Sequence, residues 1–221
     1  MHNGQLRIAD RRFSCQLQIL LGWFAAAVTL GASGVYHVNA SDVPTIQYGV
    51  LLPILIGTFM IWRSEITKRI IAAVPQEWLV SIQLYRGLGV IFLTLYATGK
   101  LPGQFAWPAG VGDIAVGLMA PVVGLAYARA PHKAGGLVAA WNVLGILDLI
   151  VAVGTGFMTA PSRFVSLDVQ PTSDLMTVLP MVLIPVYLVP LSIVLHLASL
   201  AKLRREAQAF QSGGRVADAR A

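Results

Sequence analysis

The stretch LVAAWNVLGILDLIVAV, residues 137–153, decides the fold class of this chain. It is an almost continuous run of apolar residues, and apolar and polar residues do not alternate along it. A strand of a membrane barrel alternates at every second residue over about ten residues, whereas a helix needs about 20 mostly apolar residues to cross a bilayer. The run therefore predicts a membrane-spanning helix.

The composition of the whole chain points the same way. Of its 221 residues, 56% are hydrophobic and only 12% are charged, and the mean hydropathy is +0.70. Soluble domains carry about 25% charged residues, so this chain has too little polar surface for a soluble enzyme or a soluble nucleic-acid-binding domain. Its single cysteine, Cys15, excludes an intramolecular disulfide and any metal site built from several cysteines.

Six apolar stretches can be read as membrane spans. They cover residues 16–36, 46–62, 78–98, 108–128, 135–157 and 176–200. The second stretch is the shortest and ends at Trp62, a residue type that is enriched at membrane interfaces. We predict an all-α bundle of about six transmembrane helices that forms one domain over residues 1–205, followed by a disordered polar cytoplasmic tail over residues 206–221.

The basic residues give the orientation of the spans. Under the six-span count, most of them fall in segments on one side of the membrane: Arg7, Arg11, Arg12, Arg63, Lys68, Arg69, Arg129, Lys133, Lys202, Arg204, Arg205, Arg215 and Arg220. The loops on the other side hold only Lys100 and Arg163. Since basic loops stay in the cytoplasm, both termini are predicted to be cytoplasmic, and the net charge of +6 reflects topology and not nucleic-acid binding.

The first span has an alternative interpretation as a cleaved signal peptide. Val38-Asn39-Ala40 would suit a small-residue cleavage site, although the apolar run before it is longer than the usual 7–15 residues, roughly, of a signal peptide. Cleavage would leave five spans.

Ionisable residues within the spans are candidates for a functional site because they are costly to bury in a bilayer. Arg86 and Asn142 are predicted to lie near the middle of the membrane, and Asp113 and Asp148 in its outer half. An ion pair between Arg86 and Asp148 is within reach. Such a pair would pin helices together, or it would belong to a site for a proton, an ion or a polar ligand.

The last span carries two secondary candidates, Ser192 and His196, which are four residues apart and share a helix face. His196 is predicted in the inner third of the membrane. Pro180, Pro185 and Pro190 are expected to bend this helix. No second histidine is predicted at a matching depth, so neither a metal nor a cofactor is expected.

The segment from Arg86 to Asp148, with Leu-Pro-x-x-Phe-Ala-x-Pro-Ala-Gly-x-Gly-Asp at residues 101–113, resembles uncharacterised bacterial multi-pass membrane proteins. The resemblance implies a location in the bacterial inner membrane. It brings no assigned activity.

The leading functional prediction is a membrane protein that binds or moves a small solute or ion between the third, fourth and fifth spans. Asp113 and Asp148 would be carboxylate ligands or proton acceptors, Arg86 the counter-ion, and Asn142 a neutral hydrogen-bonding wall. The lipid bilayer is one expected partner, and a homo-oligomer is expected if so small a bundle transports.

Two alternatives stay open at this stage. The first is a membrane-embedded enzyme, or a protein that binds a lipid, a quinone or another cofactor, with Asp113, Asp148 or His196 as acid or base. The second is a structural membrane subunit with a buried ion pair.

Overall fold

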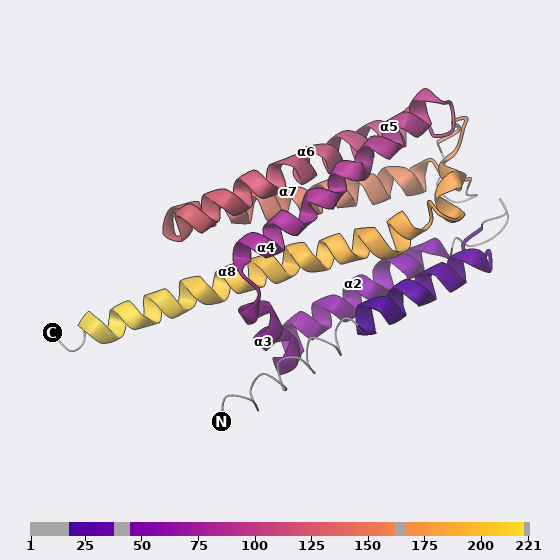
Figure 1. Cartoon of the computed structure of the whole chain (residues 1–221). Helices are drawn as coiled ribbons and strands as arrows, with labels where there is room; N and C mark the ends of the chain where they lie inside the picture. The colour runs from indigo at the N-terminus through magenta and orange to yellow at the C-terminus, as the bar shows by residue number, and fades with distance from the viewer. Residues whose placement is uncertain (1–17, 38–44, 162–166, 219–221) are drawn as a thin grey trace.

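The computed structural model describes residues 18–37, 45–161 and 167–218, and within these ranges the secondary structure is helical, without strands. Five helices are long and apolar enough to cross a membrane. They are α2 (Ile46–Arg63), the combined helix Gln76–Ala97, α6 (Gly103–Arg129), α7 (Pro131–Met158) and the combined helix Ile184–Ala209. Figure 1 shows them as an elongated bundle.

Two of these five helices are not regular α-helices throughout. The third predicted span consists of α4 (Gln76–Ser81), the 3₁₀ segment η1 (Ile82–Gly89) and α5 (Val90–Ala97). The last begins with a π-helical turn, η3 (Ile184–Leu188), and continues as α8 (Val189–Asp218). We call Gln76–Ala97 the third span from here on.

The predicted first span corresponds to the apolar helix Gln18–Ala32, which is shorter than the five long helices. Cys15 and the predicted cleavage site Val38-Asn39-Ala40 lie outside the described residues.

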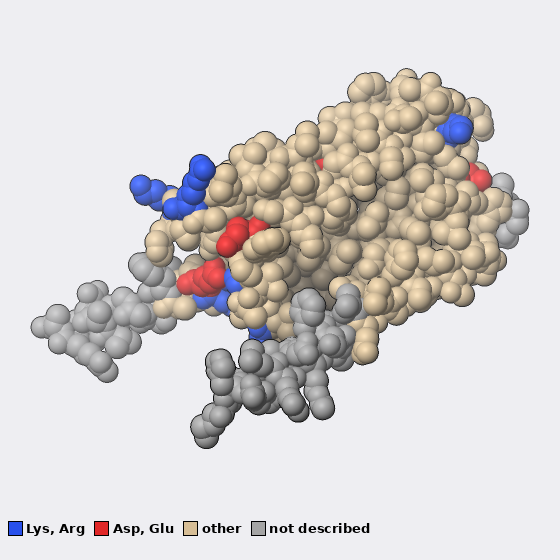
Figure 2. Space-filling view, in the orientation of Figure 1, with Lys and Arg blue, Asp and Glu red and all other residues tan. Residues whose placement is uncertain are grey.

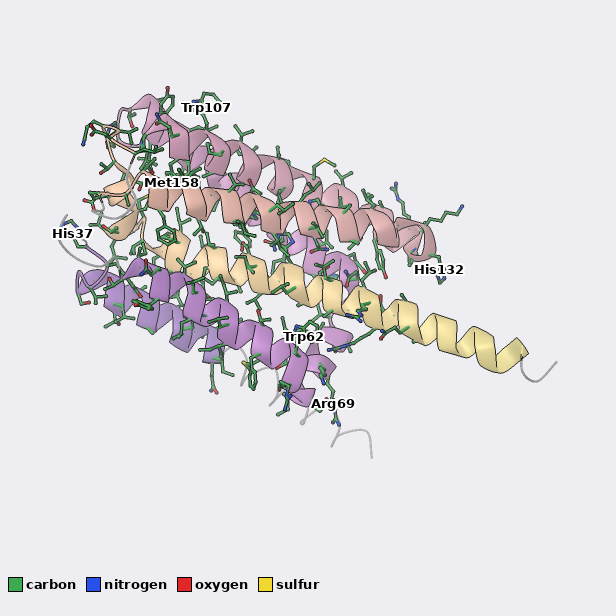
Figure 3. The ribbon with its side chains drawn as sticks, turned by 180° about the vertical axis from the view of Figure 1, so that it is seen from behind. His37, Trp62, Arg69, Trp107, His132 and Met158 are labelled. Carbon is green, nitrogen blue, oxygen red and sulfur yellow. The ribbon has the colours of Figure 1, made fainter. Side chains whose placement is uncertain are left out.

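The surface of the bundle is that of a membrane protein. Large apolar side chains point outward along the long helices, and Phe59 on α2 is 66% exposed. On the face drawn in Figure 2, Lys and Arg gather at the end where α6 turns into α7, and a broad band between the two ends is almost free of charged side chains. Figure 3 shows Trp107, Met158 and His37 at one end and His132 and Arg69 at the other. We call these the Trp107 end and the His132 end.

Small residues let the third span approach α6 closely. A Cβ atom on Gly117 would lie 2.5 Å from the backbone nitrogen of Gly87, and one on Gly124 would overlap the hydroxyl of Ser81. Such close approach is how membrane helices gain dispersion contacts without a hydrophobic driving force.

A short helix, α3 (Glu65–Ala73), links α2 to the third span and lies at the His132 end of the bundle (Figure 1). Its last carbonyl groups are held by Lys202 of α8, whose Nζ donates to the carbonyl oxygens of Ala72 at 2.9 Å and Val74 at 2.7 Å. A cation at the C-terminal end of a helix satisfies carbonyl groups that lack a partner within the helix.

Helix boundaries differ from the prediction in two places. α6 begins at Gly103, before the predicted start at residue 108, because Pro102 accepts the first hydrogen bonds of the helix, from the backbone nitrogens of Phe105 and Ala106. The start of the last span was predicted too early: Ser173–Thr177 form a separate 3₁₀ turn, η2, and the long helix begins at Ile184.

The proline residues explain the late start of the last span. Pro180 lies before the helix, and Pro185 is the second residue of the long helix, where a missing N–H group costs least. Pro190 follows the π-helical turn as the second residue of α8. The prediction that all three bend one continuous helix is therefore wrong for Pro180.

Helical backbone also extends to Asp218, into the segment 206–221 for which we predicted a disordered tail. Residues 201–209 are rich in Ala, Leu, Lys, Arg, Glu and Gln, which are strong helix formers.

Candidate intramembrane site

Arg86 lies at the centre of a charged cluster inside the bundle. It comes from the 3₁₀ segment η1, is 3% exposed, and donates from Nε to Oδ1 of Asp113 at 2.7 Å. Its Nη2 atom donates to Oδ2 of Asp148. The structure thus contains the expected pair with Asp148, and it adds Asp113 to it, so one guanidinium joins the third span to α6 and α7.

The other terminal nitrogen of Arg86 faces the last helix. Nη1 lies 3.1 Å from Nε2 of His196 on α8 and also donates to the carbonyl oxygen of Gly145 at 3.3 Å. His196 is completely buried. The sequence predicted His196 at a different membrane depth from Arg86. Depth estimated from residue numbers includes neither the tilt of one helix against another nor the length of an arginine side chain.

The hydrogen bonds of Asn142 determine which ring nitrogen of His196 carries a proton. Its Nδ2 donates to the carbonyl oxygen of Val138 at 2.8 Å and to the hydroxyl of Ser199 at 2.9 Å. Because a carbonyl oxygen only accepts, the amide nitrogen must face Val138, and Oδ1 must face Nδ1 of His196 at 2.9 Å. His196 therefore donates from Nδ1 and accepts from Arg86 at Nε2, which makes it a neutral imidazole with no free nitrogen.

Ser192, the other secondary candidate, lies outside the charged cluster. Its hydroxyl is hydrogen-bonded to the hydroxyl of Tyr85, and its backbone carbonyl accepts from Nε2 of Gln83 at 3.1 Å. About two helical turns further along α8, Nε2 of Gln76 donates to the hydroxyl of Ser199 at 2.7 Å. The third span and α8 are thus joined by polar contacts over much of their shared length.

The polar residues of α8 that face the other helices are buried and follow helical spacing. They are Ser192, His196, Ser199 and Lys202. The sequence analysis missed Gln76, Gln83, Tyr85 and Ser199. A signal was present, because Gln76 and Gln83 are seven residues apart and so lie on one helix face.

Two glycines leave room for the cluster. A Cβ atom on Gly112 would overlap Oδ1 of Asp148, and a Cβ atom on Gly145 would overlap the ring of His196. The charged groups therefore fit between α6, α7 and α8 only because these positions carry no side chain.

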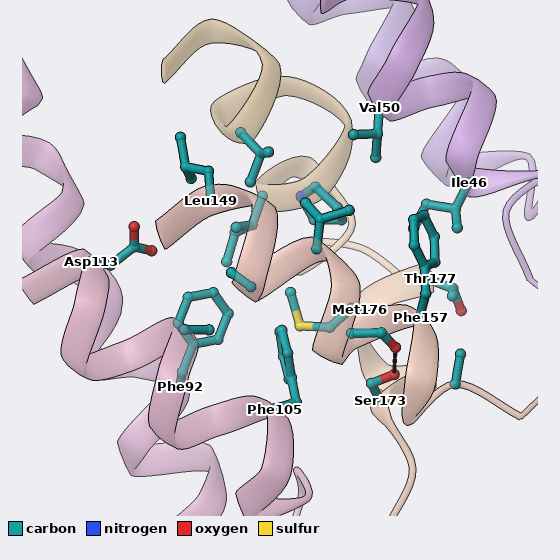
Figure 4. Close-up of a pocket in the computed structure, with 18 residues that line it drawn as sticks. Ile46, Val50, Phe92, Phe105, Asp113, Leu149, Phe157, Ser173, Met176 and Thr177 are labelled. Carbon is teal, nitrogen blue, oxygen red and sulfur yellow. Dashed lines mark hydrogen bonds between the residues drawn. The ribbon is translucent and has the colours of Figure 1, made fainter. Parts of the chain in front are cut away.

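A cavity of about 80 Å³ lies next to the cluster, towards the Trp107 end. Its walls come from α2, α5, α6, α7, η2, η3 and α8, and nearly all of its lining residues are apolar. Asp113 is the one ionisable side chain among them. In Figure 4 the Asp113 carboxylate lies near Phe92 and Leu149, at the opposite side of the cavity from Ser173 and Thr177.

The cluster does not have the donor set of a metal site. Among the described residues, no group of three or more His, Cys, Asp or Glu side chains is arranged to hold a metal ion.

These features define an all-helical membrane protein with a charged network between its helices. Residues 43–204, which include every member of the network, match the family model described as Domain of unknown function (DUF8737). Since the match covers most of the chain, the protein belongs to this family, and the predicted resemblance to uncharacterised proteins is confirmed. Neither the curated proteins nor the solved structures contain a match.

Proposed function

We propose that this protein is a six-span protein of the bacterial inner membrane, with both termini in the cytoplasm, that binds and moves a small solute or ion. Asp113 and Asp148 are the binding carboxylates, Arg86 is their counter-ion, and Asn142 is the neutral group that orients the network. The observation that carries this proposal is that two partly buried carboxylates share one buried guanidinium.

The charge count supports binding over a purely structural role. Asp113 and Asp148 contribute two negative charges, Arg86 contributes one positive charge, and the imidazole of His196 is neutral. One negative charge is left over, and an unpaired charge at the centre of a membrane helix costs about 2.5–3.5 kcal/mol on insertion scales. A proton or a cation on one carboxylate removes this cost. A structural pair needs only one carboxylate.

The surroundings of the network differ on its two sides. Asp113 lines the cavity that lies towards the Trp107 end, the predicted outer side. On the opposite side of Arg86, the imidazole and amide of His196 and Asn142 fill the space between the helices with fixed hydrogen bonds. Movement of a solute past this point requires the helices to shift, and the 3₁₀ and π segments beside the cluster are the kind of irregular helix found at hinges and functional sites.

Flux measurements test the proposal. The full chain is reconstituted in liposomes, a potential is imposed, and the movement of protons and of Na⁺ is followed with fluorescent indicators. We expect flux above that of empty liposomes, and we expect it to be lost in Asp113→Asn and in Asp148→Asn.

Asp168→Asn is the matched control, since Asp168 is an exposed aspartate outside the network. It should transport as the native protein does. Folded Asp113→Asn and Asp148→Asn variants with native flux, or a native protein without any flux, would contradict the proposal.

A further inference from the structure

We propose that the cavity beside Asp113 binds a small lipophilic organic cation, namely a short branched alkyl group that carries one ammonium group. The ammonium group pairs with the Asp113 carboxylate, and the alkyl group fills the apolar part of the cavity. This inference rests on the proposed function and names its solute class.

The carboxylate of Asp113 has one oxygen available for a ligand. Oδ1 accepts from Nε of Arg86, and no described residue donates a hydrogen bond to Oδ2. The Asp113 side chain is 15% exposed. Since Asp113 lines the cavity, its carboxylate is accessible to a molecule inside it.

The rest of the cavity favours an organic cation over a metal ion. Metal cations such as Ca²⁺ take six to eight oxygen ligands, roughly, whereas Asp113 offers one free oxygen. The other polar side chains in the lining, Ser173 and Thr177, lie at the opposite side of the cavity from Asp113 (Figure 4), so their hydroxyl oxygens do not complete a metal site around its carboxylate.

Aromatic rings also line the cavity in which the Asp113 carboxylate would bind the ammonium group. Phe92 and Phe105 both line it, and their rings meet edge to face with centroids 5.4 Å apart. Phe92 lies beside the Asp113 carboxylate in Figure 4. The faces of aromatic rings attract ammonium groups, so carboxylate and rings act on the same charge.

The net charge of the network sets the charge of the ligand, and the volume of the cavity sets its size. The network carries one excess negative charge, so a single positive charge neutralises it. A cavity of about 150 Å³ takes up benzene, and this cavity, at about 80 Å³, suits a branched alkyl group smaller than a benzene ring.

Equilibrium dialysis of radiolabelled isobutylamine against the full chain in lipid nanodiscs tests the inference. Isobutanol is the neutral probe of the same shape. We expect the native protein to bind the amine roughly tenfold more tightly than the alcohol, because a charge-assisted hydrogen bond replaces a neutral one. Asp113→Asn should remove this preference, and Asp168→Asn should keep it.

A second variant tests the cavity without touching the charges. Ala152 is buried and lines the cavity on α7, so Ala152→Leu fills the space that the alkyl group needs. Both probes should bind more weakly to it. Equal binding of amine and alcohol to the native protein overturns the inference whether or not the variants fold, and so does unchanged amine binding in Ala152→Leu.

The two proposals fail separately. Proton or Na⁺ flux that depends on the carboxylates, without binding of isobutylamine, would leave the proposed function standing and remove the organic cation. Binding of isobutylamine without movement of isobutylamine, protons or Na⁺ across the liposome membrane would do the reverse.

Discussion

Arg86 makes more contacts across the bundle than any other ionised side chain in the described part of the chain. Its guanidinium bonds to Asp113 on α6, to Asp148 and the Gly145 carbonyl on α7, and to His196 on α8. A guanidinium can do this because its five N–H donors point in fixed directions within one plane. One side chain therefore determines how four helices meet.

Removal of Arg86 alone should be far worse than removal of the whole cluster. Arg86→Leu leaves two partly buried carboxylates inside the bundle without a counter-ion, and we expect a loss of about 3–5 kcal/mol in unfolding free energy. The triple variant Arg86→Leu, Asp113→Leu, Asp148→Leu should recover most of that loss, because apolar replacements of a buried ion pair are often neutral. Thermal unfolding in nanodiscs measures both. A triple variant less stable than Arg86→Leu would contradict this account.

His196 should behave as a hydrogen-bonding residue and not as an acid or base. His196→Gln keeps one donor and one acceptor and should remain close to native stability. His196→Phe leaves Arg86 and Asn142 each short of a partner, and a buried unsatisfied group costs about 1–3 kcal/mol. Unfolding measurements compare the two variants. Equal stability of the glutamine and phenylalanine variants would show that these hydrogen bonds are not needed.

Sequence reasoning reached the charged residues more easily than the uncharged ones. Arg86, Asp113 and Asp148 could be identified because charges are rare within spans. Tyr85 and Ser199 could not, because hydroxyl groups are common in membrane helices and only the rotation of each helix decides which of them meet. The same rotation decides that His196 faces Arg86.

The elements carry irregularities that the hydropathy pattern does not contain. The sequence predicted a continuous helix for the third span and a helix bent at its prolines for the last, whereas the structure has a 3₁₀ segment around Arg86 and a π-helical turn at Pro185. Hydropathy records how apolar a segment is. It does not record which carbonyl each N–H group bonds to, so a change of helix type leaves no trace in it.

Gly112 on α6 should be intolerant of a side chain. Gly112→Ala places a Cβ atom on Oδ1 of Asp148, so α6 and α7 must separate or the ion pair must shift. We expect a clear drop in the unfolding temperature. Gly136→Ala on α7 is the matched control, because a Cβ atom there has nothing within 4 Å, and alanine is favoured over glycine in a helix by about 0.5–1 kcal/mol. Equal effects of the two substitutions would contradict the close approach at Gly112.

At the scale of the whole molecule, charge separates the two ends of the bundle. Arg69 and the turn near His132 lie at one end, and Trp107 lies at the other (Figure 3). The sequence predicted the apolar helices and their polar ends because both are local properties of the chain. The order in which the helices pack is not local, since it depends on side chains that are far apart in the sequence, such as Arg86 and His196.

The predicted orientation can be measured with single cysteines in a chain that carries Cys15→Ser. Lys100→Cys places a thiol on an exposed position between the third span and α6, and Lys133→Cys places one on an exposed position in the first turn of α7. A maleimide that does not cross membranes should label Lys100→Cys in intact spheroplasts, and Lys133→Cys only after permeabilisation. The opposite pattern would invert the topology, and labelling of both in intact cells would exclude the six-span arrangement.

The position of Arg86 has a consequence for biosynthesis. The carboxylate of Asp113 follows it by 27 residues, that of Asp148 by 62, and the imidazole of His196 by 110. During translation the third span therefore leaves the ribosome before any of these partners has emerged. Its apolar residues have to carry an unpaired guanidinium into the bilayer, or it has to wait at the translocon until α6 arrives. The final network is thus completed only when the last helix has been synthesised.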